Sequence, residues 1–172
     1  MLRWCLKQRV LKENHYHRCI PDGISVTMVF TVYSSVNMKK NYHLCLSAGD
    51  ETLFRDTADY HRGFNCFASA LHKTDATGLA ETFMSTHTHM LVQTDDPDEF
   101  MYTFRRAYSI YFNHKYQREG RLGEKRHFSM EVAGYHHLLA ALSYILRNAL
   151  HHGVVSIPYA YPHCSVNAIF RK

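Results

Sequence analysis

STHTHMLV, residues Ser85–Val92, places two histidines one residue apart at the start of a short apolar run. Successive side chains of a β-strand point to opposite faces, so a strand here puts His87 and His89 on one face and Thr88 on the other. The two histidines would lie about 7 Å apart along the backbone, because a strand rises ~3.3 Å per residue. Two imidazoles on a rigid strand can converge on one cation, so the segment predicts part of a metal site.

Length and composition indicate one folded domain with an extension. The chain has 172 residues, 46% of them hydrophobic, which is enough for a proper core. No apolar run is long enough to cross a membrane, so we expect no membrane-spanning segment. The five cysteines form no C-x-x-C pair, which favours reduced thiols and a cytoplasmic protein. We expect an N-terminal extension over 1–37 and a core domain over 38–172.

The charge is distributed unevenly along the chain. The net charge is +5 overall, but residues 38–99 carry −5 and residues 100–172 carry +7. A basic face on a nearly neutral body suits a polyanionic partner. A solvated helical surface explains the same charges equally well.

Hydrophobic periodicity predicts seven elements in the order β-α-β-β-α-β-α. The expected ranges are strands at 41–48, 79–86, 88–94 and 127–132, and helices at 56–72, 98–117 and 135–151. No glycine-rich phosphate loop follows a strand, which excludes a dinucleotide-binding fold. The β-α-β-β-α-β run is typical of an α+β, ferredoxin-like fold, an antiparallel sheet with helices packed on one face.

The last predicted helix offers partners for the two histidines. Tyr144 and Asn148 are four residues apart and share one helix face, and His137 and His151 each lie seven residues from Tyr144. A tyrosine beside an amide oxygen and a metal site is a candidate nucleophile for a phosphodiester. A free tyrosine has a pKa near 10, so this role requires a metal or a base nearby. The alternatives are a core tyrosine and ordinary surface histidines.

The segment from Asn41 to Ser165 resembles the HUH single-tyrosine transposases, specifically the REP-associated branch. The matching stretches, in order, are YHLCL (42–46), ETLFRDTADY (51–60), FMSTHTHMLVQ (83–93), FRRAYSIYFNHKYQREGRL (104–122), LLAALSYILRNALHHGVV (138–155) and YPHCS (161–165). The third resembles the family's F-M-P-N-H-x-H-L-L-V segment, and the fifth resembles its catalytic helix.

The resemblance implies a catalytic tyrosine, Tyr144, on the C-terminal long helix, with His87, His89 and Asn148 as ligands of Mg²⁺ or Mn²⁺. The implied reaction is cleavage and rejoining of single-stranded DNA near hairpins through a 5′-phosphotyrosine intermediate. Phosphate contacts are expected from basic residues in the second half of the chain, namely Arg105, Arg106, Lys115, Arg121, Lys125 and Arg126. The sequence leaves open whether the active form is a homodimer.

The chain departs from the family pattern in several places. Thr88 replaces a hydrophobic residue, Ser85-Thr86 replaces Pro-Asn, and Ala149 replaces a proline. The loop with Gly123 and 124–126 also differs, which bears on DNA-sequence preference. We expect Thr88 to weaken packing behind its strand. Two alternatives remain open: a weakened or non-catalytic DNA-hairpin-binding protein of this fold, and a ferredoxin-like RNA-binding or regulatory domain with structural histidines.

Overall fold

The computed structural model describes residues 39–49 and 51–167. The expected extension over 1–37, and its boundary with the core, therefore lie outside the described residues. Nine elements follow one another in the described part: β1 (Lys40–Ser47), α1 (Thr57–Lys73), β2 (Thr77–Phe83), β3 (His87–Thr94), α2 (Pro97–Tyr116), β4 (Phe128–Glu131), α3 (Tyr135–Leu146), α4 (Asn148–His151) and the 3-10 helix η1 (Pro158–Ala160).

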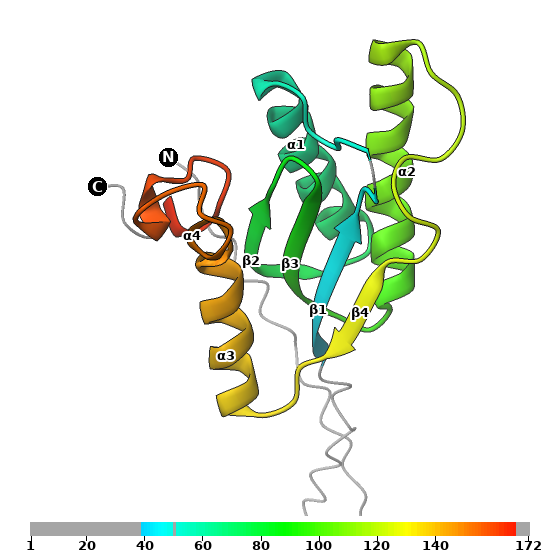
Figure 1. Ribbon diagram of the computed structural model, residues 1–172. Coiled ribbons are helices and arrows are strands. Elements are labelled where there is room, and N and C mark those ends of the chain that lie inside the picture. The colour runs from blue at the N-terminus through cyan, green and yellow to red at the C-terminus, as the bar shows by residue number, and fades with distance from the viewer. Residues whose placement is uncertain (1–38, 50, 168–172) are drawn as a thin grey trace, which may run out of the picture. The chain divides into compact units, whose positions relative to one another are not determined.

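The four strands form one sheet in the order β2-β3-β1-β4, and every neighbouring pair is antiparallel (Figure 1). In the central pair, Cys45 lies opposite His89 and Leu46 lies opposite Thr88. The α+β class and the antiparallel sheet are therefore confirmed. None of the helices in the described residues is both long and apolar enough to cross a membrane.

The helices begin where the sequence supplies caps. Asp56 caps α1 and forms a reciprocal capping box with Asp59. Asp96 caps α2 by accepting hydrogen bonds from two backbone N–H groups, and Pro97 occupies its first turn. These caps fix the two helices that cover one face of the sheet.

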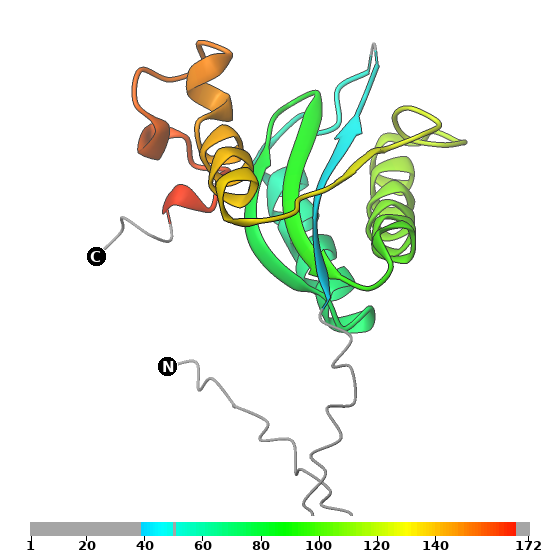
Figure 2. The same ribbon diagram turned by 90° about the horizontal axis from the view of Figure 1, so that it is seen from below.

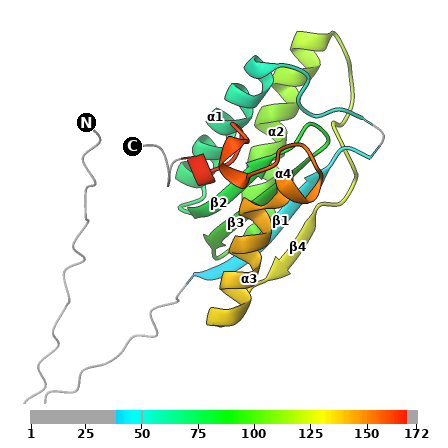
Figure 3. The ribbon, with the colours of Figure 1, turned by 60° about the vertical axis from the view of Figure 1, so that its left-hand side comes forward.

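Helices pack on both faces of the sheet. Figure 3 shows α1 and α2 behind the sheet and α3 in front of it, and Figure 2 shows the same separation from below. The two helices of the β-α-β-β-α-β run thus share one face as expected, whereas α3 covers the opposite face. Alternation along β3 explains this arrangement, because Met90 and Val92 join the core under α1 and α2 while Leu91 joins the cluster under α3.

The last long helix is interrupted. The sequence predicts one helix over 135–151, but α3 ends at Leu146 and α4 begins at Asn148. The backbone at Arg147, with φ −101° and ψ 5°, leaves the α-helical region. The Asn148 side chain beyond this break is completely buried and faces His87 on the sheet.

The C-terminal segment returns to the sheet along β2. Phe83 N–H donates to the carbonyl of His163, and Ser165 N–H donates to the carbonyl of Glu81, both at 2.9 Å. Thr82 and Cys164 form an antiparallel bridge between these contacts. The Thr82 hydroxyl also donates to the Ile145 carbonyl of α3 at 2.7 Å. These bonds fix the end of α3 against the sheet.

Candidate active site

His87 and His89 lie on the face of the sheet that α3 covers. Their ring centroids are 5.1 Å apart, and the intervening Thr88 is completely buried on the other face. The Thr88 hydroxyl accepts a hydrogen bond from Leu46 N–H at 3.3 Å. The hydroxyl that replaces an apolar side chain therefore has a partner, which offsets the expected loss of packing.

A third histidine, His43 on β1, lies directly beside His89. The Nε2 of His43 is 3.0 Å from the Nδ1 of His89, and both side chains are buried. This contact leaves the Nε2 of His89 available for another ligand. A hydrogen bond to the second ring nitrogen commonly orients a metal-binding histidine. Sequence reasoning missed His43, although the alternation of NYHLCLSA places it on the face opposite Leu44.

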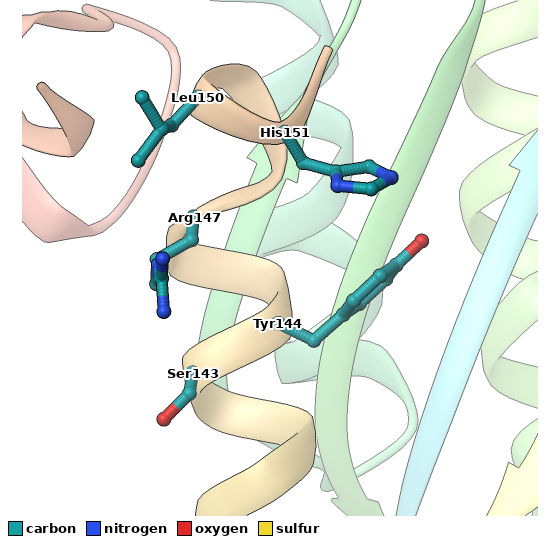
Figure 4. Close-up of a pocket in the computed structure, with 5 residues that line it drawn as sticks. All are labelled: Ser143, Tyr144, Arg147, Leu150 and His151. Atoms are coloured by element: carbon teal, nitrogen blue, oxygen red, sulfur yellow. The ribbon is translucent and has the colours of Figure 1, made fainter. Parts of the chain in front are cut away.

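Tyr144 projects from α3 toward these histidines. Figure 4 shows its ring extending toward the sheet with His151 on the same side, while Ser143 and Arg147 point away. The ring centroid of Tyr144 lies 5.2 Å from that of His89 and 5.9 Å from that of His43. The residue is 45% exposed, so solvent reaches part of its side chain.

Asn148 approaches the site from the start of α4. Its Oδ1 lies 3.1 Å from the Nε2 of His87, and the Nδ1 of His87 lies 3.1 Å from the Thr86 hydroxyl. Within residues 39–49 and 51–167, the buried Nδ2 of Asn148 has no hydrogen-bond partner. A second residue that sequence reasoning missed, His152, lies 5.0 Å from His87 between ring centroids.

Burial keeps the histidines of this site neutral. It lowers the pKa of His89 to about 3, and the positive charge that neighbouring histidines would carry adds to this shift. Burial also lowers the pKa of His43. It lowers the pKa of His87 as well, although the hydrogen bond of His87 to Asn148 acts in the opposite direction. Neutral imidazoles have free lone pairs at pH 7, as metal binding requires.

The donor set fits a divalent cation that accepts both nitrogen and oxygen. His87 and His89 would supply imidazole nitrogens and Asn148 an amide oxygen, in place of the present contact between His87 Nε2 and Asn148 Oδ1. The described residues contain no cluster of three or more His, Cys, Asp or Glu side chains suited to a metal. A cation held by the two histidines would therefore need the amide oxygen of Asn148 as well. Imidazole ligands favour Mn²⁺ over Mg²⁺, which prefers oxygen ligands and water.

Three of the expected phosphate-binding residues gather at one cavity. Arg105, Arg106 and Arg121 line a cavity of about 500 Å³ between α2 and the following loop, together with His127. Arg105 also donates to the loop carbonyl of Glu124 at 2.6 Å. Burial and the nearby charge of Arg121 lower the pKa of Arg105, which indicates positive charge that an anion would stabilise. Lys125 and Arg126 are exposed in the same loop but do not line this cavity.

Lys115 has a different environment from the other basic residues. Its ammonium group lies 2.7 Å from Asp56 and 2.6 Å from the buried carboxylate of Asp59. Tyr116 also donates to Asp59, at 2.7 Å. Burial alone would raise the pKa of Asp59, but these hydrogen bonds hold it below its usual value. Lys115 thus joins α2 to α1, which gives it a structural role.

Comparison with known proteins identifies the fold. No family model and no curated protein sequence matches this chain. Among solved structures, a REP-associated tyrosine transposase bound to a REP hairpin matches with a TM-score of 0.63 and 13% identity, covering 76% of this chain and 79% of that one. A protein of Deinococcus radiodurans described as a candidate transposase matches with a TM-score of 0.45 and 14% identity, covering 64% and 90%. The chain has the fold of a REP-associated tyrosine transposase.

Proposed function

We propose that this protein is a metal-dependent, single-tyrosine DNA strand transferase acting on single-stranded DNA near hairpins. The observation that carries the proposal is the convergence of three elements. The Tyr144 ring on α3 lies 5.2 Å from that of His89 on β3, and Asn148 of α4 lies 3.1 Å from His87. Nucleophile and ligand set therefore meet on one face of the sheet, where the partly exposed tyrosine is accessible to DNA.

The proposed chemistry is an in-line displacement at phosphorus. The Tyr144 oxygen attacks the scissile phosphate and forms a phosphotyrosine bond to the 5′ end of the downstream strand. The bond to the preceding 3′ oxygen breaks, the phenol proton leaves to water, and the 3′ oxygen takes a proton to become a free hydroxyl. Rejoining reverses these bond changes with an incoming 3′ hydroxyl. A bound divalent cation would polarise the phosphate and neutralise developing negative charge.

The residues of this chain hold the reacting groups in place. His43 orients His89 through its ring nitrogen, and Thr86 contacts the corresponding nitrogen of His87. The basic cavity lined by Arg105, Arg106 and Arg121 suits the phosphates of a flanking strand or hairpin stem. The hairpin bound by the transposase of the same fold supports this substrate class.

A covalent-adduct assay tests the proposal. The full chain is incubated with Mn²⁺ and a pool of single-stranded oligonucleotides with and without a hairpin, labelled at one end. We expect a 3′ label to migrate with the denatured protein and a 5′ label to be released on a shorter strand. Tyr144→Phe and His87→Ala should both abolish the adduct.

Tyr135→Phe is the matched control, because Tyr135 lies on the same helix and is 70% exposed. It should form the adduct at the wild-type rate. An undiminished adduct with Tyr144→Phe would show that another residue is the nucleophile. Hairpin binding by wild-type protein without any adduct would instead identify a non-catalytic hairpin-binding protein.

A further inference from the structure

The face of the sheet that carries the histidines is only partly covered. Helix α3 packs on β2 and β3 through a small cluster that includes Leu91, Ala141 and Ile145. The neighbouring strands β1 and β4 extend beyond it. On β4, Phe128 is 50% exposed and Met130 is 38% exposed. Large apolar side chains thus remain accessible beside α3.

These side chains form one wall of a groove. The groove has a volume of about 480 Å³ and lies between β4, β1 and α3. His43, Cys45, His89, Phe128 and Met130 line it from the sheet, and Ala140 and Tyr144 are among the residues that line it from the helix. The small alanine side chain leaves room between the helix and the strands, so the groove is apolar and open at one side.

Aromatic rings surround the space in the groove. The His43 ring contacts the Phe128 ring edge-on at 5.6 Å and the Tyr144 ring at 5.9 Å between centroids. A planar aromatic ligand can stack on such rings, and stacking is how proteins hold single-stranded bases without reading their sequence. The imidazoles of His43 and His137 add polar groups to the lining that can meet the polar edges of a base.

The position of the groove identifies its ligand. Tyr144 belongs both to the groove and to the proposed active site, so a phosphate at its hydroxyl places the adjoining nucleoside next to the groove. His127, the residue before Phe128, lines the basic cavity with Arg105 and Arg121, and its Nε2 lies 3.1 Å from the carboxylate of Asp98, which also lines the cavity. A strand crossing β4 would thus meet cations that suit its phosphates and an apolar recess that suits a base. An apolar peptide would gain nothing from the adjacent cations, and an acyl chain has no flat ring to stack on the aromatic side chains of the groove.

We propose that this groove binds one unpaired nucleobase next to the scissile phosphate, stacked on Phe128. The inference rests on the proposed function, because it uses Tyr144 to locate the phosphate. The groove holds the base out of any duplex and so fixes the position of the phosphate relative to the Tyr144 oxygen. It thereby selects single-stranded over paired DNA at the cleavage point.

The test combines a base deletion with a ring deletion. Binding is measured with the full-length Tyr144→Phe protein and single-stranded oligonucleotides that carry one abasic site, moved one position at a time around the cleavage point. One position should lower the affinity by about 5- to 100-fold, the range known for loss of one stacked base. Phe128→Ala should cause a similar loss on intact DNA, and the two changes together should cost little more than either alone.

Phe128→Trp keeps a stacking ring and should retain affinity. Ile110→Ala is the matched control, because Ile110 is 61% exposed on α2 and lies outside the groove. A thermal melt of each variant separates lost stacking from unfolding. The inference would be overturned if the losses from the abasic site and from Phe128→Ala multiplied when combined. It would also be overturned if Phe128→Ala bound intact DNA as tightly as the Tyr144→Phe protein that carries Phe128.

Two outcomes separate this inference from the proposed function. An adduct that requires Tyr144 but is indifferent to Phe128 and to the abasic position rejects the groove alone. Coupled losses of affinity without any adduct from wild-type protein retain the groove and reject the chemistry. Loss of self-association in Phe128→Ala with unchanged DNA affinity would show that the groove is an interface between copies, which also overturns the inference.

Discussion

The two faces of the sheet differ in how completely helices cover them and in the side chains they carry. The face under α1 and α2 is closed by large aromatic side chains, including Phe83, Phe104 and Tyr108, that are almost completely buried. The face under α3 has a small cluster of alanines and aliphatic residues beside three histidines and an exposed tyrosine. The first face contributes most of the buried apolar surface. The second face holds the histidines and the tyrosine in a partly buried environment that solvent and ligands can still reach.

Close packing on the closed face extends to the backbone. Gly63 of α1 lies so near the aromatic core that a Cβ atom there would come within 2.6 Å of the Phe54 ring. The Tyr108 hydroxyl donates to the carbonyl of Leu53 at 2.6 Å, which satisfies a polar group inside that core. Such packing leaves no room for a ligand. Incomplete cover by α3, by contrast, leaves side chains of the opposite face accessible to a ligand.

The largest expected effect is on the stability of the closed face. Phe104→Ala should lower the free energy of unfolding by about 3–5 kcal/mol, because it removes a fully buried ring and leaves a cavity. Urea denaturation measures this loss. Tyr102→Ala on the same helix, where the side chain is 65% exposed, should change stability by less than about 1 kcal/mol. Similar losses for the two variants would contradict the comparison.

The next effect concerns Glu81, a partly buried acid on β2. Burial raises the pKa of Glu81 from 4.5 to about 7. Between these values the folded state holds a proton that the unfolded state has released, so stability falls as pH rises. The loss, complete above pH 7, should be on the order of 3 kcal/mol.

Glu81→Gln resembles the protonated acid and should remove this dependence. The difference in unfolding free energy between wild type and variant, measured at several pH values, isolates Glu81 from the histidines. The histidines act in the opposite direction, because their lowered pKa values make stability fall as pH decreases below 6.5. A difference that is flat with pH would show that the Glu81 carboxyl ionises normally.

His43 tests the open face. His43→Leu removes the partner of the His89 ring and should weaken Mn²⁺ binding by about 10- to 100-fold. His43→Gln places an amide oxygen near the lost nitrogen and should restore part of the affinity. Calorimetry gives the binding constant, and nitrogen NMR of His89 reports its tautomer in the metal-free protein. Unchanged affinity and tautomer in both variants would show that the contact does not orient His89.

The smallest effect belongs to Thr88, which lies between the two histidines in sequence but points to the closed face. Thr88→Val removes the hydrogen bond with Leu46 N–H but retains the shape of the side chain. We expect a change in unfolding free energy of less than about 1 kcal/mol, because the lost hydrogen bond and the added apolar burial oppose each other. Chemical denaturation measures it, and a loss above 2 kcal/mol would mean that the hydroxyl is essential to the strand pair.

Local patterns predicted the elements well, because caps and alternation act over a few residues. Asp56 and Pro97 mark the helix starts that the structure contains. The contact between His43 and His89 joins residues 46 positions apart, and no local pattern reports it. The ion pair of Lys115 with Asp59 joins residues 56 positions apart and is equally invisible to local patterns, while the phosphate contact expected of Lys115 stays a prediction. The proposed roles of Tyr144 and Asn148 came from resemblance and spacing, and they stay predictions.

The C-terminal return along β2 has a consequence for the behaviour of the protein in a crowded cell. An outer strand of a sheet exposes backbone donors and acceptors that can recruit a strand from another molecule and start aggregation. Residues 163–165 occupy such groups at the C-terminal end of β2 through their bonds to Glu81 and Phe83. The opposite outer strand of the described sheet, β4, has four residues and offers little length for such pairing. The same tail that fixes α3 thus also shortens the outer edge on which another strand could add.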